Sequence, residues 1–164
     1  MKYIIKSGFR KSELWDENKR KITTIHQPLW DSRKRSISDA DGTVQYRIEK
    51  EGNQFRIWDN SKEIFHGKIL YPTDSAGRSN ETCPIRPPFP KRLLLTGNNI
   101  AYHFEQQENH TIEISSKGSP IAVLNRMLSR THVLETFCEF SPSFSALLFV
   151  LGQYLVADDA LLCV

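Results

Sequence analysis

The chain has 164 residues, a length typical of one domain with a substantial core, and we expect residues 1–164 to form a single domain. Charged residues make up 25% of the chain and apolar residues 39%, which excludes a disordered chain and favours an ordinary soluble protein. The net charge of +3 is too small to indicate a nucleic-acid partner. Its distribution is uneven, because residues 1–50 hold 12 basic and 7 acidic side chains, which allows a basic face in the N-terminal part.

The N-terminal stretch and the cysteines predict a cytoplasmic protein. In MKYIIKSGFRKSELW the apolar part spans two or three residues and charges follow at once, which is unlike a signal peptide. Cys83, Cys138 and Cys163 are odd in number and lack the spacing of a metal site. Free thiols in a reducing compartment are therefore expected.

Short strands and turns alternate through the first 70 residues. The segment KYIIKSGF predicts a strand that ends at Gly8, and Asp16-Glu17-Asn18 predicts a turn before a strand at 21–25. Two similar segments follow, SISDADGTVQYRIEK and FRIWDNSKEIFHGKI, each with an Asp-containing turn between two strands. In the first segment Val44, Tyr46 and Ile48 occupy alternate positions, as expected of a strand with one buried face. The two segments predict successive hairpins of an antiparallel meander.

Residues 72–92 hold five of the eight prolines of the chain. Proline cannot donate to a strand ladder, so this stretch predicts a long loop. Alternation returns in RLLLTGNNIAYHFEQ and HTIEISSKG. The pattern that follows fits strands at 121–124 and 133–140, and it allows a helical turn between them near 125–129.

The last apolar stretch predicts a buried helix. Ser141 is suited to cap it and Pro142 to its first turn. Residues 144–157 are apolar on every side of a helix, so protein or lipid must enclose them. These 14 residues are fewer than the roughly 20 needed to span a bilayer, and two acidic residues follow at 158–159. We therefore expect no transmembrane segment, and a β-barrel that closes around a central helix.

The segments SISDADGTVQYRIEK, FRIWDNSKEIFHGKI and SFSALLFVLGQYLVADD together resemble the tubby C-terminal-like superfamily. Its LURP-one-related and phospholipid scramblase-like branch is the nearest in pattern. The resemblance implies a mainly β (α+β) fold, an antiparallel closed β-barrel of about twelve strands around the buried hydrophobic C-terminal helix. The chain departs from the family where Asn60-Ser61-Lys62 replaces a glycine turn, and it has no counterpart of the scramblase calcium segment. The phosphoinositide-contacting residues of tubby domains cannot be placed by motif and are not carried over.

The sequence offers no motif for a metal ion or a cofactor. The run at Asp39 and Asp41, like Asp59, lacks the twelve-residue loop of a calcium site, so these side chains are expected to bind backbone amides in turns. The histidines fit no ligand spacing and are interpreted as surface or strand-face residues. They are His26, His66, His103, His110 and His132.

No nucleophile motif indicates an enzyme. The chain lacks G-x-S-x-G. Cys138 stands beside Glu139 in an expected strand, and a neighbouring carboxylate does not activate a thiol as a nucleophile. We therefore predict a non-enzymatic protein without catalytic residues.

Two basic runs are the candidate binding site. They are Lys19-Arg20-Lys21 and Arg33-Lys34-Arg35, near Trp15 and Trp30. Basic side chains beside aromatic ones are typical of sites for phosphate groups, and each contributes about 1 kcal/mol near an anionic bilayer. If the runs share one face, they predict a cytoplasmic binding module, peripheral at a membrane, for anionic phospholipid head groups. The alternatives are solvated turns, or a protein-interaction domain that uses the 72–92 loop as its contact segment.

Overall fold

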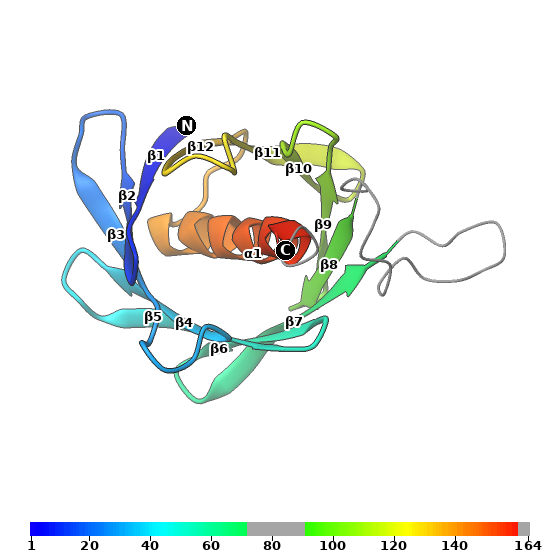
Figure 1. Cartoon of the computed structure of the whole chain (residues 1–164), viewed down its shortest axis with the longest axis horizontal. Helices are drawn as coiled ribbons and strands as arrows, with labels where there is room; N and C mark the ends of the chain where they lie inside the picture. The colour runs from blue at the N-terminus through cyan, green and yellow to red at the C-terminus, as the bar shows by residue number, and fades with distance from the viewer. Residues whose placement is uncertain (72–90, 161–164) are drawn as a thin grey trace, which may run out of the picture.

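Twelve antiparallel strands close into one barrel in the computed structural model, and a single helix lies inside it (Figure 1). The structure describes residues 1–71 and 91–160, with side chains to Val156 in the helix. The elements are β1 (Lys2–Ser7), β2 (Lys11–Trp15), β3 (Lys21–His26), β4 (Lys34–Asp39), β5 (Val44–Glu51), β6 (Gln54–Asp59), β7 (Lys62–Leu70), β8 (Arg92–Gly97), β9 (Ile100–Gln106), β10 (Ile112–Ser116), β11 (Ser119–Asn125), β12 (Thr131–Thr136) and α1 (Pro142–Ala160).

Each strand pairs with its neighbours in the sequence, and β1 closes the barrel by pairing with β12. The connections consequently alternate between two ends of the barrel. The helix enters after β12 at one of them, here called the entry end, which includes the turns 16–20, 40–43, 60–61, 98–99 and 117–118. It finishes at the opposite, exit end, which includes the connections 8–10, 27–33, 52–53, 107–111 and 126–130. Tyr154 confirms this direction, because its hydroxyl donates to the Ser32 carbonyl in the 27–33 connection at 3.3 Å.

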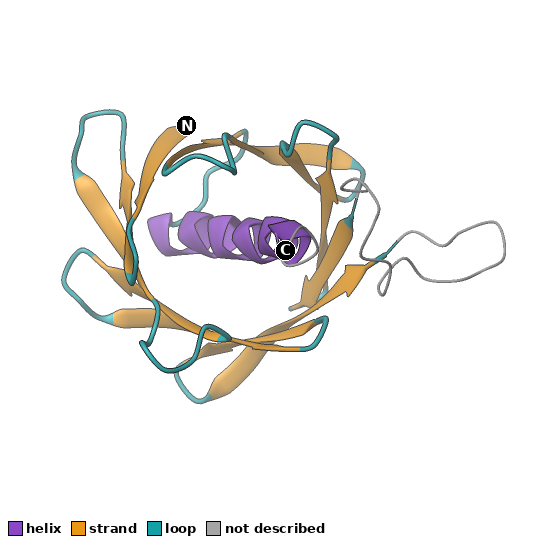
Figure 2. Cartoon of the chain, in the orientation of Figure 1, coloured by secondary structure: helices purple, strands orange, loops and turns teal. Residues whose placement is uncertain are grey.

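The helix lies inside the barrel, as the sequence predicts (Figure 2). Ser141 caps it, since its Oγ accepts a hydrogen bond from the Phe144 N–H at 3.2 Å. Residues 146–151 are 0% exposed and pack against inward-facing side chains of the strands. Gly152 lets the helix approach the barrel wall closely, because a Cβ at this position would lie 2.5 Å from Leu124 Cδ1. The prediction of a closed barrel around a buried helix is confirmed.

The prediction for the buried face of β5 is wrong at its first residue. Val44 is 44% exposed, whereas Ile48 is fully buried. The register of β4 and β5 shifts between Ile37 and Ser38, which pair with Tyr46 and Val44. The extra residue of this bulge turns the start of β5 away from the core.

The segment before the helix also differs from the prediction. The strand expected at 133–140 is β12, which ends at Thr136, and Cys138 lies exposed in the connection to α1. The stretch 125–129 is a tight turn rather than a helical one, in which Ser129 N–H donates to the Arg126 carbonyl. Cys83, Cys163 and residues 72–90 of the loop predicted at 72–92 lie outside the described residues, and Arg92, at the end of that prediction, begins β8.

Candidate functional site

The two predicted basic runs lie at opposite ends of the barrel. Residues 19–21 close the β2–β3 hairpin at the entry end, whereas residues 33–35 lie where the β3–β4 connection ends, at the exit end. Strand β3 separates them, and at about 3.3 Å per residue its six residues span roughly 20 Å. The six side chains therefore do not form one basic face.

The entry-end run is a solvated hairpin turn. Lys19 has a positive φ of 59°, and the Arg20 N–H donates to Asp16 Oδ1 at 2.8 Å. Lys21 Nζ lies 3.8 Å from Glu13 Oε1. This carboxyl also receives Lys11 at 3.0 Å, and the Lys11 hydrogen bond lowers the pKa of Glu13. The geometry matches the solvated-turn alternative.

The exit-end run divides into surface and interior residues. Arg33 binds Asp31 through two nitrogens, with Nε 3.0 Å from Oδ1 and Nη2 3.4 Å from Oδ2, and this pairing lowers the pKa of the Asp31 carboxyl. Lys34 is exposed at the start of β4. Arg35 instead turns inward to the helix, where it donates to Gln153 Oε1 and stacks on Tyr154 at 4.8 Å from the ring centroid. Burial lowers the pKa of the Arg35 guanidinium.

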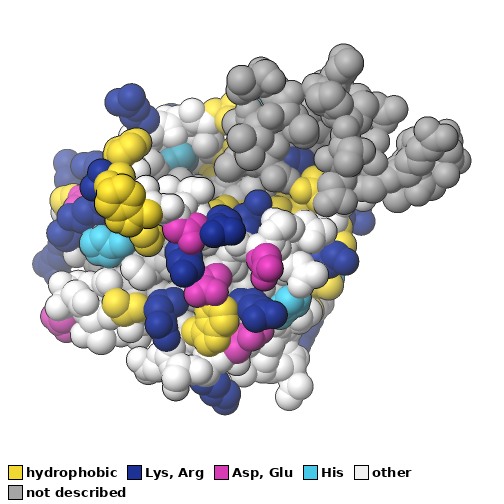
Figure 3. Space-filling model, turned by 60° about the horizontal axis from the view of Figure 1, so that its bottom comes forward, with side chains coloured by type: hydrophobic (Ala, Val, Ile, Leu, Met, Phe, Trp, Pro, Cys, Tyr) yellow, Lys and Arg dark blue, Asp and Glu magenta, His cyan; other side chains and the backbone are white. Residues whose placement is uncertain are grey.

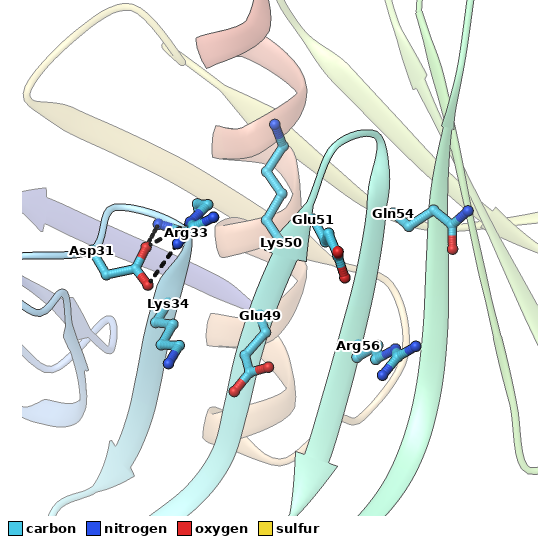
Figure 4. A pocket seen from close by; sticks show the side chains of 8 residues that line it. All are labelled: Asp31, Arg33, Lys34, Glu49, Lys50, Glu51, Gln54 and Arg56. Atoms are coloured by element: carbon cyan, nitrogen blue, oxygen red, sulfur yellow. Dashed lines mark hydrogen bonds and ion pairs between the residues drawn. The ribbon is translucent and has the colours of Figure 1, made fainter.

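An open groove runs over the outer face of β4, β5 and β6 beside Arg33 (Figure 4). It measures about 530 Å³, and Lys34, Glu49 and Arg56 cross its floor as directly paired neighbours on three strands. Its lining comprises Asp31, Arg33, Lys34, Glu49, Lys50, Glu51, Gln54 and Arg56. With basic and acidic groups in near balance, the groove has no marked preference for a ligand of one charge.

Large apolar side chains are exposed to solvent on three connections of the exit end. Phe9 is 88% exposed, Trp30 89% and Leu128 70%. The connections 8–10, 27–33 and 126–130 that carry them are neighbours, and we call them together the exit rim. Gln27 N–H donates to the Arg10 carbonyl at 2.9 Å, and Ser7 N–H donates to the Arg130 carbonyl at 2.8 Å.

Basic residues surround these apolar side chains. The exit rim carries Arg10, Arg33, Arg126 and Arg130. Its one carboxylate, Asp31, forms an ion pair with Arg33. No carboxylate among residues 1–71 and 91–156 lies within ion-pair distance of the other three arginines. Figure 3 shows exposed apolar side chains among Lys and Arg at one edge of the molecule. The exit rim is thus both apolar and cationic.

Sequence reasoning found only part of the exit rim. Of its residues the basic-run pattern identified Trp30 and Arg33, and it missed Phe9, Leu128 and their arginines. A signal was present, because each apolar residue stands in or beside a turn with arginine nearby, as in Gly8-Phe9-Arg10. Only the closed topology shows that these turns are neighbours.

A buried polar chain below the exit rim was also missed. His132, 3% exposed, lies 2.7 Å through Nε2 from Ser7 Oγ and 3.0 Å through Nδ1 from the Arg126 carbonyl. A carbonyl only accepts, so the proton is assigned to Nδ1, and Nε2 accepts from Ser7. Burial lowers the pKa of His132, although the Arg126 carbonyl opposes this. The ring also packs on Phe149, with 4.8 Å between ring centroids, and is a satisfied core residue.

Two searches for other kinds of site concern the described residues alone. They contain no group of three His, Cys, Asp or Glu side chains placed to hold a metal ion. None of their helices has the length and apolar character needed to cross a membrane.

The Asp39 side chain has the predicted turn role, since its Oδ1 accepts from the N–H groups of Asp41 and Thr43, both at 3.0 Å.

Comparison with known proteins finds a similar fold and indicates no function. No protein-family model matches the chain, and no curated protein does. An X-ray structure of a protein from Arabidopsis thaliana is similar, with 12% identity and a TM-score of 0.54 over 97% of this chain and 90% of that one. At this identity the likeness shows a shared fold alone.

Proposed function

We propose that this chain is a non-enzymatic cytoplasmic module that docks on anionic phospholipid membranes through the exit rim. The observation that carries the proposal is the exposure of Phe9, Trp30 and Leu128 on three neighbouring connections among arginines. Aromatic residues with basic neighbours are favoured where the acyl chains of a bilayer meet its head groups. The resemblance to the tubby C-terminal-like superfamily, which includes the phospholipid scramblases, supports a lipid as the partner.

The energies expected of such a rim suit reversible binding. Full burial of one large apolar side chain contributes about 1.5–3 kcal/mol, and insertion to the head-group boundary realises a part of this. Each arginine near an anionic leaflet adds about 1 kcal/mol. Three apolar tips and the arginines Arg10, Arg126 and Arg130 therefore supply several kcal/mol, enough for peripheral binding.

A vesicle co-sedimentation assay tests the proposal. The protein should sediment with vesicles of phosphatidylcholine and phosphatidylserine and stay in the supernatant with phosphatidylcholine alone. Replacing Arg10, Arg126 and Arg130 by Glu should abolish sedimentation. The matched control replaces Lys19, Arg20 and Lys21 by Glu at the entry end, with the same change of charge, and should keep most of the binding.

Two outcomes would overturn the proposal. The first is failure of the unaltered protein to bind acidic vesicles at low salt, where the Debye length of about 30 Å at 0.01 M leaves the attraction unscreened. The second is equal loss of binding in the exit-rim and entry-end variants, which would show a response to net charge. Self-association in place of vesicle binding would indicate protein contact rather than membrane contact.

A further inference from the structure

A small cavity opens beside the exit rim, between the β1–β2 turn and the end of the helix. It measures about 50 Å³. This exceeds the roughly 10–15 Å³ that one water needs, so the cavity has room for several waters or one compact ion. Arg10, Lys11 and Arg35 line it together with Ser12, Gln27 and Gln153, and its lining contains no carboxylate.

Arg35 is the ordered cation of this cavity. Its guanidinium is held by the Tyr154 ring on one side and by Gln153 Oε1 at Nη1, so it loses little freedom on binding a ligand. Its Nε is buried without a hydrogen-bond partner among the residues the structure describes. No carboxylate within the same described part of the chain lies at ion-pair distance from it. A charge held this way is normally balanced by an opposite charge.

The other lining groups suit the same ligand. Arg10 and Lys11 are exposed residues of the lining. The Lys11 ammonium pairs with Glu13 Oε1 at 3.0 Å, and the Arg10 guanidinium lies 5.7 Å from the centroid of the Phe9 ring. Gln153 accepts from Arg35 through Oε1, which leaves its amide nitrogen to donate. The Ser12 hydroxyl adds a further donor. An ordered guanidinium, two further basic residues and a lining without carboxylates match the charge of a phosphate group.

We propose that this cavity binds one phosphate monoester group, with Arg35 as the ordered ligand and Arg10 and Lys11 closing over the anion. The group comes either from a lipid head group or from a free phosphate. The lipid source rests on the proposed function, since the exit rim would bring the cavity to the membrane; phosphate binding itself does not depend on it.

The first arm of the test uses inorganic phosphate and the full chain. Titration at constant ionic strength, followed by ¹⁵N NMR, should shift the Arg35 Nε–H and Gln153 side-chain amide signals saturably. Chloride at the same ionic strength should leave them in place. Arg10→Gln with Lys11→Gln, two exposed positions, should weaken phosphate binding at least about tenfold, or about 1.4 kcal/mol. Lys19→Gln with Arg20→Gln is the matched control and should bind as the unaltered protein does.

The second arm identifies the source of the phosphate. Vesicles with phosphatidic acid, a phosphate monoester, are compared with phosphatidylglycerol vesicles, a diester, at equal surface potential. A lipid source predicts tighter binding to phosphatidic acid, and loss of that preference in the Arg10→Gln, Lys11→Gln variant. Equal binding to the two lipids would overturn the lipid source.

The two arms separate this inference from the proposed function. Trp30→Ser should weaken vesicle binding and leave the response to inorganic phosphate unchanged. Absence of saturable shifts with phosphate, or identical shifts with chloride, would overturn the cavity as a phosphate site whatever the vesicles show.

Discussion

Arg35 stacks on Tyr154, with its guanidinium carbon 4.8 Å from the ring centroid, and so joins strand β4 to the last turns of the central helix. The adjacent Gln153 accepts a hydrogen bond from the same guanidinium. These contacts join the helix to the barrel wall at the exit end, while Ser141 caps its first turn at the entry end. A residue that sequence reasoning assigned to a surface ligand site therefore has a position in the interior.

The Arg35–Gln153 contact should show strong coupling in a double-mutant cycle. Gln153→Leu leaves a buried N–H without an acceptor and should lower the free energy of unfolding by about 1–3 kcal/mol. Arg35→Met removes the charge as well, so adding it to Gln153→Leu should cost little more. Urea denaturation of the four proteins measures this. Fully additive losses would contradict the contact.

The enclosed helix predicts a contrast between two leucines. Leu148 is 0% exposed and Leu128 is 70% exposed. Leu148→Asp places a carboxylate in the core and should cost more than about 4 kcal/mol, enough to abolish folding. Leu128→Asp is the matched control and should change stability by less than about 0.5 kcal/mol. A folded, strand-rich Leu148→Asp protein in circular dichroism would contradict the central helix.

Gly152 predicts a steric limit between the helix and the barrel wall. A Cβ at this position lies 2.5 Å from Leu124 Cδ1 and 3.2 Å from Ile112 Cδ1. Gly152→Val should therefore destabilise the protein by about 1–3 kcal/mol through overpacking, despite the better helix propensity of valine. Leu124→Ala in the same chain should restore part of that loss. A Gly152→Val protein as stable as the unaltered one would show that the wall has room.

His132 predicts lower stability in mild acid. Burial, the main cause, lowers its pKa in the folded state below the ordinary value of 6.5, so the unfolded state binds the proton more readily. The contribution of neutral His132 to the free energy of unfolding is complete above pH 6.5. It falls as the pH drops below that value, by at most about 1.4 kcal/mol per pH unit. Urea denaturation from pH 7.5 to 5 measures the slope. His132→Gln should flatten the slope, and an unchanged slope in that variant would contradict the assignment.

The sequence predicts the fold well because its strongest signals are local. Ser141 before an apolar run predicts the capped helix, and the alternation around Ile48 and Phe55 predicts the hairpins. Val44 shows the limit of prediction from alternation. A bulge shifts the register by one residue there, and the alternating pattern of the sequence does not reveal it.

The candidate site could be predicted only in part, because it depends on which turns are neighbours. Residues 19–21 and 33–35 are close in sequence, yet a strand places them at opposite ends. Phe9 and Leu128 are far apart in sequence, yet the pairing of β1 with β12 brings their connections together. Closure of the barrel supplies this information, and charge patterning does not contain it.

Insertion of Trp30 into a membrane is the most direct test of the exit rim. The measurement is tryptophan fluorescence with vesicles of phosphatidylserine and brominated phosphatidylcholine, whose bromine atoms quench only tryptophans that enter the acyl region. The unaltered protein should be quenched on binding. Trp30→Phe should lose that quenching, whereas Trp58→Phe, on the outer face of β6, should keep it. Quenching that persists in Trp30→Phe, or binding without any quenching, would contradict docking through the exit rim.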